Sequence, residues 1–153
     1  NDFSMTKKEK YIEEVGLFYE KYGLPKMAGR ILGYLMSSES DNNSFEDLQS
    51  ALKASKGSIS GNVNLLLNQS MIEKHMISGD RKSYYTIAHD SLENILVAKA
   101  QSVTRFKEII ESGLKLDNKK TRKGEKLAEI FRYYEFLERE IPALRLKWDE
   151  LNN

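Results

Sequence analysis

The chain has 153 residues, of which 40% are hydrophobic and 31% are charged, and its formal net charge at pH 7 is +1. This length suits one domain, or one domain with an extension, and no apolar run approaches the roughly 18 residues of a membrane span. The absence of cysteine excludes disulfides and thiolate chemistry, and the first residues do not resemble a secretory signal, so we expect a cytoplasmic protein without a membrane partner.

Two amphipathic helices are expected in the first quarter of the chain. The first covers 7–22 and ends at Gly23. In the second, Gly29 and Gly33 lie one turn apart, and each costs roughly 1 kcal/mol relative to alanine. A close crossing with another helix would explain why this cost is accepted. The polar stretch 37–44 predicts a loop.

The stretch 45–88 has the order helix, tight turn, helix, strand, charged loop, strand. Ser44 and Ser55 are placed to cap two helices that are separated by a turn of only two or three residues. Two segments rich in strand-forming residues follow, 71–77 and 84–88, and the loop between them contains a glycine and two cations. This order predicts a winged helix-turn-helix.

The second helix of this motif has the properties of a DNA recognition helix. At about 100° per residue, one inner arc contains the core positions Ile59, Val63, Leu66 and Leu67, and the opposite surface is small, polar and free of carboxylates. Asparagine can pair with adenine, and serine and lysine can reach phosphates or guanine. At the hairpin tip, Arg81 can enter a minor groove while Lys82 contacts phosphate. The predicted DNA-binding residues are Lys56, Gly57, Ser58, Ser60, Gly61, Asn62, Asn64, Asn68, Arg81 and Lys82.

The distribution of charge is consistent with this prediction. The segment 53–85 has five bases and two acids, whereas 38–50 has four acids and no base. Nucleic-acid binding depends on where charge lies rather than on its sum. A second basic segment, 105–126, has eight bases and four acids, and we interpret it as a solvated surface. The hairpin cations could also serve only solubility.

Three motifs resemble the GbsR branch of the MarR-like winged helix-turn-helix transcriptional regulators. They are the run 23–35, the motif Ser55-Lys-Gly-Ser-Ile-Ser60 and the motif Gly79-Asp-Arg-Lys-Ser-Tyr-Tyr85, and the resemblance covers roughly 13–88. It implies a dimeric winged-helix repressor or activator whose recognition helix begins at the Ser-Lys-Gly-Ser motif. Members of this branch are associated with osmoprotectant genes and some respond to choline. That ligand does not carry over, because the resemblance rests on the DNA-reading half.

The C-terminal part predicts two further long helices. Asp90-Ser-Leu-Glu93 is a cap-and-acid pattern for the first, 115–120 breaks the pattern, and Pro142 kinks the second or restarts it as a short helix. Long amphipathic helices outside a compact winged domain need a partner, and the resemblance implies pairing across a two-fold axis. We therefore assign 1–89 to the N-terminal helices plus the DNA-binding region, and 90–153 to a dimerisation and effector region.

No catalytic or metal-binding pattern is visible. His75 and His89 are not at ligand spacing, so neither a zinc site nor a cofactor is expected. The Gly-x-Ser-x-Gly pattern at 57–61 lacks the preceding strand of a nucleophile elbow. Aromatic residues could form a pocket for a cationic effector, although core or dimer interface is the interpretation that we favour. They are Tyr11, Phe18, Tyr19, Tyr22, Phe131, Tyr133, Tyr134, Phe136 and Trp148.

The sequence thus predicts a mainly α fold with a small β-hairpin (α+β), a winged helix-turn-helix with N- and C-terminal helices forming a dimerisation region. The predicted function is sequence-specific transcriptional regulation, with repression as the expected effect, by a homodimer on double-stranded DNA. It is not expected to be an enzyme, and a small-molecule effector is left open. The alternative is a winged-helix module for protein contacts that does not read DNA.

Overall fold

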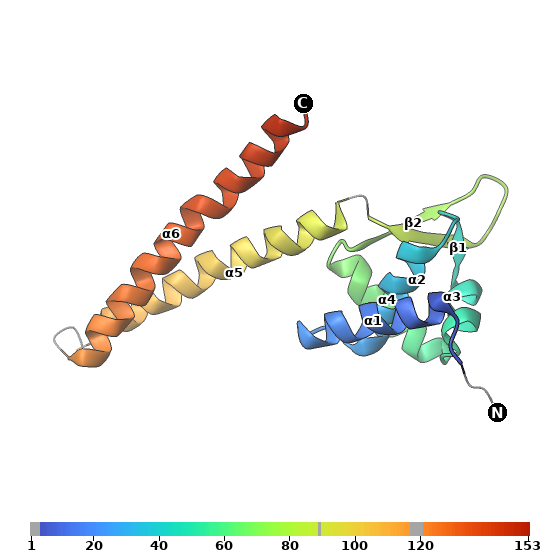
Figure 1. The fold of residues 1–153 in the computed structure, drawn as a ribbon, viewed down its shortest axis with the longest axis horizontal. Coiled ribbons are helices and arrows are strands. Elements are labelled where there is room, and N and C mark those ends of the chain that lie inside the picture. Colours follow the sequence, from blue (N-terminus) through green and yellow to red (C-terminus); the bar gives the residue numbers. More distant parts are fainter. Residues whose placement is uncertain (1–3, 89, 117–120) are drawn as a thin grey trace. The chain divides into compact units, whose positions relative to one another are not determined.

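A computed structural model describes residues 4–88, 90–116 and 121–153, and the chain divides into two compact units, Asn1–Asn94 and Ile95–Asn153 (Figure 1). The first unit contains α1 (Lys7–Lys21), α2 (Lys26–Ser37), β1 (Asn43–Ser44), α3 (Phe45–Leu52), α4 (Lys56–Asn68), β2 (Ile72–Met76) and β3 (Ser83–Ile87). Helix α5 (Ser91–Leu114) begins at the end of this unit and continues into the second, where α6 (Arg122–Leu151) follows. The predicted mainly helical fold with a small antiparallel sheet is confirmed.

The predicted helix starts are confirmed at atomic level. Ser44 and Asp47 form a reciprocal capping box at α3, in which each side chain accepts a hydrogen bond from the other residue's backbone N–H. The Ser55 hydroxyl accepts from the backbone N–H of Ser58 at the start of α4. Each cap satisfies an amide that has no partner within its helix, so these short polar residues determine where the helices begin.

Helices α1 and α2 cross closely, as the glycine spacing in α2 predicts. A Cβ added at Gly29 would lie 2.8 Å from the Cα of Gly16, and one added at Gly33 would lie 3.0 Å from the Cα of Ile12. Both neighbours are backbone atoms, which cannot move without moving the whole of α1. Ile12 in α1 and Ile31 and Leu32 in α2 are all buried, so this crossing forms part of the core.

The sheet has three strands in the order β1-β3-β2, whereas the sequence predicted only the hairpin of β2 and β3. Residues 37–44 were expected to be a loop, but Asn43 and Ser44 pair antiparallel with Tyr85 and Tyr84. The Asn43 side chain is buried; its amide nitrogen donates to the backbone oxygens of Tyr85 and Ser40. A two-residue strand has no periodicity of its own, and only its distant partner defines it.

In the second unit, α5 and α6 form a helical hairpin with few buried side chains. The rings of Phe106 and Tyr134 lie 5.0 Å apart, Lys107 Nζ lies 2.8 Å from a Glu138 carboxylate oxygen, and Ile110 is buried. The sequence predicted either a kink or a restart at Pro142; helix α6 continues through this residue, so the restart is wrong. Within the described residues, no helix is long and apolar enough to cross a membrane.

Three sequence expectations fall partly or wholly outside the described residues. The predicted break at 115–120 lies between the end of α5 and the start of α6, but residues 117–120 themselves are not described. His89 is not described either. Helix α5 begins at Ser91, just after the predicted cap residue Asp90, and the side chains of 91–96 that would complete the cap-and-acid pattern are not described.

Candidate nucleic-acid interface

The turn between α3 and α4 is built by three consecutive residues. Lys53 adopts a left-handed backbone conformation with φ of 50°, and the backbone N–H of Ala54 donates to the oxygen of Gln49 at 3.3 Å. Ser55 then caps α4. The predicted turn of two or three residues is therefore confirmed, and it determines the direction in which α4 leaves α3.

Helix α4 has one buried and one exposed side. Ile59, Val63 and Leu66 are buried, as predicted, whereas Leu67, which was predicted to share this inner arc, is only half-buried. Its sequence contains no acidic residue. Eight of the residues predicted to contact DNA lie in α4. Three of these are half-buried, namely Ser58, Ser60 and Asn62, and five are exposed, namely Lys56, Gly57, Gly61, Asn64 and Asn68.

Two details refine the exposed surface of α4. The Asn62 amide nitrogen donates to the backbone oxygen of Ser58 at 2.7 Å, so this side chain is held along its own helix. At Gly57 and Gly61 an added Cβ would meet no described atom within 4 Å apart from its chain neighbours and the backbone of its own helix, so the helix is open on that side. An open, carboxylate-free backbone surface permits close approach of a phosphate or a base edge.

The wing is the β2–β3 hairpin, and an aspartate holds its tip. Gly79 has φ of 85°, a left-handed conformation that glycine adopts without strain. The Asp80 carboxylate accepts hydrogen bonds from the Tyr84 hydroxyl at 2.5 Å and from the backbone N–H of Lys82 at 2.9 Å. Arg81 and Lys82 are exposed beside it. Asp80 therefore stabilises the turn that presents these two cations.

Sequence reasoning counted Asp80 only as a negative charge. The position of Asp80 in a turn was a local signal for its contact with Lys82, because aspartate commonly accepts a hydrogen bond from the backbone N–H two residues later. The contact with Tyr84 was not predictable from spacing alone, because it requires the two strands to pair with His75 opposite Tyr84. The rings of these two residues lie 6.1 Å apart, and His75 Nε2 lies 2.8 Å from the side-chain oxygen of Asn42.

The contact between Asp80 and Tyr84 should depend on pH at both extremes. The Tyr84 hydroxyl, and then the Lys82 backbone N–H, hold the pKa of Asp80 below its ordinary 3.8, while the same contact raises the pKa of Tyr84 above 10.0. The contribution of the Asp80 carboxylate to the stability of the folded chain is therefore complete above pH 3.8. It is lost as pH falls through the lowered pKa of Asp80. The contribution of the protonated Tyr84 hydroxyl to the stability of the folded chain is complete below pH 10.0. It is lost as pH rises through the raised pKa of Tyr84.

We expect Tyr84→Phe to return the pKa of Asp80 towards its ordinary value. NMR titration of the Asp80 carboxyl carbon measures this directly. Tyr22→Phe is the matched control, because Tyr22 is an exposed tyrosine at the C-cap of α1 and is not part of the wing. An identical Asp80 titration in the wild type and Tyr84→Phe would contradict the hydrogen bond.

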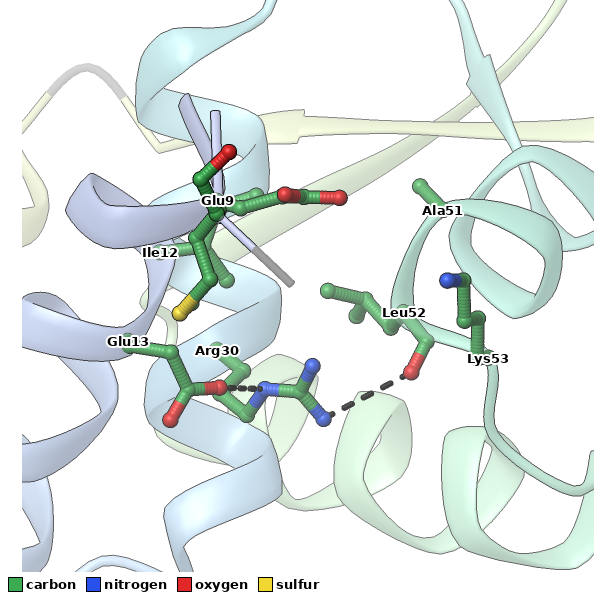
Figure 2. Close-up of a pocket in the computed structure, with 9 residues that line it drawn as sticks. Glu9, Ile12, Glu13, Arg30, Ala51, Leu52 and Lys53 are labelled. Atoms are coloured by element: carbon green, nitrogen blue, oxygen red, sulfur yellow. Dashed lines mark hydrogen bonds and ion pairs between the residues drawn. The ribbon is translucent and has the colours of Figure 1, made fainter. Parts of the chain in front are cut away.

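Candidate sites of other kinds are less well formed. Among the described residues, no group of three or more His, Asp or Glu side chains could hold a metal ion. The predicted aromatic cluster is divided between the two units; Tyr19 is buried, Phe18 contacts it edge-on, and Tyr134 contacts Phe106. A hollow of about 360 Å³ lies between α1, α2 and the end of α3 (Figure 2). It is lined by Ser4, Met5, Glu9, Ile12, Glu13, Arg30, Ala51, Leu52 and Lys53.

Three of the four charged side chains that line this hollow already have partners. Glu9 completes the capping box of α1 with Thr6, and Glu13 pairs with Arg30 and Lys26. The hollow therefore has few polar groups left to orient a ligand. We do not assign a small-molecule site to it.

The helix-turn-helix and the wing together form a winged-helix fold, and the comparisons with known proteins find similarity to MarR-like transcriptional regulators. Residues 90–151 match the family model described as MmpR5-like MarR family transcriptional regulator. The HTH-type transcriptional regulator MmpR5 of Mycobacterium tuberculosis is 29% identical over 105 residues, which are 69% of this chain and 64% of that protein. The chain thus spans just under two thirds of the length of this relative.

A solved structure shows the same fold over nearly the whole chain. A crystal structure described as that of a transcriptional regulator has a TM-score of 0.80 at 23% identity and covers 95% of this chain and 99% of its own. MepR, a transcription regulator of the Staphylococcus aureus multidrug efflux pump MepA, overlaps more loosely, with a TM-score of 0.46 at 15% identity over 79% of this chain and 88% of that one. These relatives are described as regulators rather than enzymes, and they do not single out the GbsR branch.

Proposed function

We propose that this chain is a sequence-specific DNA-binding transcriptional regulator that acts as a homodimer in the cytoplasm. Helix α4 enters the major groove, and the β2–β3 wing reaches the adjacent minor groove. The observation that carries this proposal is the exposed side of α4, which has no carboxylate, opens onto the backbone at Gly57 and Gly61, and presents Asn64 and Asn68 to solvent. Asparagine amides can pair with adenine in the major groove, where a carboxylate would repel the nearby phosphates.

A homodimer is supported by apolar side chains that the isolated chain leaves exposed. In α1 and at its C-cap these are Leu17, Phe18 and Tyr22, each more than half exposed. In α6 they are Leu144, Leu146, Trp148 and Leu151, also more than half exposed. Exposed apolar surfaces of this kind mark sites of interaction with other molecules. Two copies related by a two-fold axis would place their α4 helices in successive major grooves, about 34 to 36 Å apart.

Two finer assignments belong to the same proposal. The motifs at 23–35, 55–60 and 79–85 support the GbsR branch of the MarR-like regulators. We assign 1–89 to DNA binding and 90–153 to dimerisation and response to an effector, with repression as the regulatory outcome. The alternative, a module that binds only proteins, would leave the acid-free surface of α4 without a role.

Selection from random DNA duplexes tests the proposal. The purified full chain is mixed with a pool of random duplexes at several salt concentrations, and the bound sequences are recovered. We expect an enriched site with dyad symmetry and a steep loss of affinity as salt increases, because each phosphate contact releases counterions. No enrichment at low salt, with a dimer established by sedimentation, would reject specific DNA reading in favour of the protein-binding module.

Arg81→Ala should weaken binding most for sites with A·T-rich flanks. Narrow A·T-rich minor grooves concentrate negative potential, which an inserted arginine side chain exploits. Titration of duplexes that differ only in their flanks measures the effect. Lys82→Ala is the matched comparison: it should weaken all duplexes about equally and reduce the salt slope by about 1, as expected for a phosphate contact. Equal effects of both substitutions on all flanks would contradict minor-groove insertion.

A further inference from the structure

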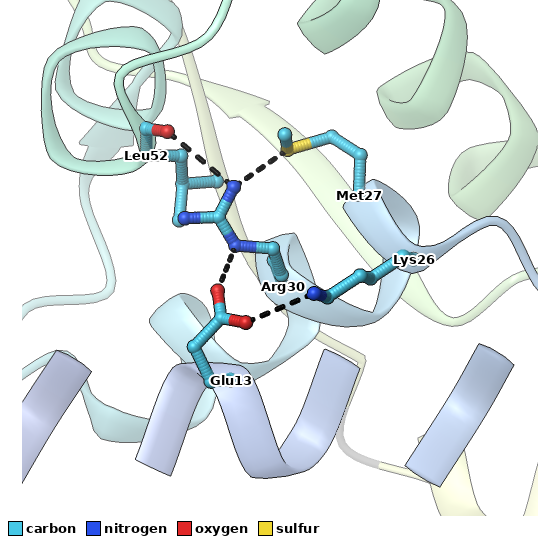
Figure 3. A network of polar contacts seen from close by, with 5 residues as sticks. All are labelled: Glu13, Lys26, Met27, Arg30 and Leu52. Carbon is cyan, nitrogen blue, oxygen red and sulfur yellow. Dashed lines mark hydrogen bonds and ion pairs between the residues drawn. The ribbon is translucent and has the colours of Figure 1, made fainter. Parts of the chain in front are cut away.

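Arg30 links three helices of the first unit. From α2, its Nε lies 2.7 Å from Glu13 Oε1 on α1, and its Nη1 lies 3.5 Å from the backbone oxygen of Leu52, the last residue of α3 (Figure 3). The contact with Glu13 is an ion pair rather than an aligned hydrogen bond. Lys26 Nζ holds the other oxygen of Glu13 at 3.1 Å. The Arg30 side chain is mostly buried, at 24% exposure.

The backbone oxygen that Arg30 reaches is located directly before the turn into α4. The last carbonyls of a helix have no partner within the helix and carry the negative end of its dipole, so a guanidinium there is favourable. At 3.5 Å the hydrogen bond itself is weak, and the positive charge beside the helix end contributes as well. The next residue, Lys53, has the left-handed conformation that begins the turn.

Gly16 in helix α1 leaves space for the side chain of Arg30. A Cβ at Gly16 would lie 2.8 Å from the Arg30 Cγ, so any other residue at position 16 would displace the aliphatic stem of Arg30. Glu13 is located three residues earlier on the same helix, and its carboxylate contacts the guanidinium at Nε, next to the aliphatic stem (Figure 3). The absence of a side chain at Gly16 and the carboxylate of Glu13 together determine the path of Arg30 from α2 towards α3.

We propose that Arg30 is a positioning residue for DNA reading: held by Glu13, it fixes the end of α3, and thereby the turn and the orientation of α4. The proposal rests on the proposed DNA-binding function and deepens it. A lysine could not replace it, because a single ammonium at the end of a flexible stem cannot contact Glu13 and the Leu52 oxygen in the same fixed arrangement. None of these residues contacts DNA in the proposed docking, so their effect would pass through α4.

The first test needs no DNA. Hydrogen exchange is measured at the Ala54 amide, which donates to Gln49, and at the Ser58 amide, which donates to Ser55. We expect exchange about tenfold faster in Arg30→Gln and Arg30→Lys, since hydrogen bonds to charged groups contribute on this scale. Lys26→Gln is the matched control, because Lys26 shares Glu13 but does not reach Leu52. Unchanged exchange in both Arg30 variants, each folded by circular dichroism, would overturn the proposal.

The second test compares specific with non-specific binding. With the selected site, both Arg30 variants should lose about tenfold in the ratio of specific to non-specific affinity, while affinity for unrelated duplexes changes little. A reduction of both affinities by the same factor would overturn a positioning role. If the wild type itself shows no sequence preference, the proposed function fails, and the exchange measurements alone then decide whether Arg30 holds the turn.

Discussion

Gly29→Ala is expected to lower the free energy of unfolding by about 1 to 3 kcal/mol, the usual range for overpacking. Helix propensity alone predicts the opposite sign, a gain of roughly 1 kcal/mol for alanine over glycine in a helix. Packing should prevail, because the new methyl group would lie 2.8 Å from the Cα and 3.0 Å from the backbone oxygen of Gly16. Relief requires α1 to move away from α2, which would also disturb the burial of Ile12.

Gly61→Ala provides the control for this prediction. Gly61 also lies inside a helix, but apart from its chain neighbours and the backbone of α4 no described atom is within 4 Å of an added Cβ. Here helix propensity acts alone, and the free energy of unfolding should increase by up to about 1 kcal/mol. Urea denaturation of the full chain, followed by circular dichroism, measures both variants. A stabilised Gly29→Ala variant would show that the helix crossing is looser than the structure describes.

Gly61→Glu should abolish DNA binding, with a loss of about a hundredfold or more for every duplex. The substitution puts a carboxylate in the middle of the surface proposed to face the major groove, and juxtaposed like charges cost several kcal/mol. The glutamate has room in the folded chain, so the fold should be retained. Fluorescence anisotropy with the selected site and with an unrelated duplex measures the loss.

Gly113→Glu is the matched control for the loss of binding. Gly113 lies within α5, where an added Cβ likewise has no described atom within 4 Å, and it is remote in sequence from the proposed DNA-binding residues. The same change of charge there should leave affinity nearly unaltered. Asn64→Ala should have a different signature: relaxed choice at one base position, by about 1 to 3 kcal/mol, without general loss. Normal binding by Gly61→Glu would exclude α4 as the recognition helix.

In the wing, some features of the proposed DNA-binding site could be predicted from the sequence and others could not. The strands and the cationic loop were predicted, because strand-forming residue types and a glycine turn are local signals. That Asp80 holds the tip was not predicted, because its contact with Tyr84 depends on strand register. The ten proposed DNA-binding residues stay a prediction, and the structure adds that the Asn62 amide is engaged by its own helix.

The sequence by itself determined the features that depend on neighbours in the chain. Capping by Ser44 and Ser55, the inner arc of α4 and the close approach implied by Gly29 and Gly33 all follow from local spacing. Tertiary structure alone decided the rest. The Asn43 amide reaches the backbone oxygen of a residue 42 positions away, and the Arg30 guanidinium reaches one 22 positions away. Such partners have no local signature, because the packing of whole helices and strands determines which backbone oxygen lies within reach.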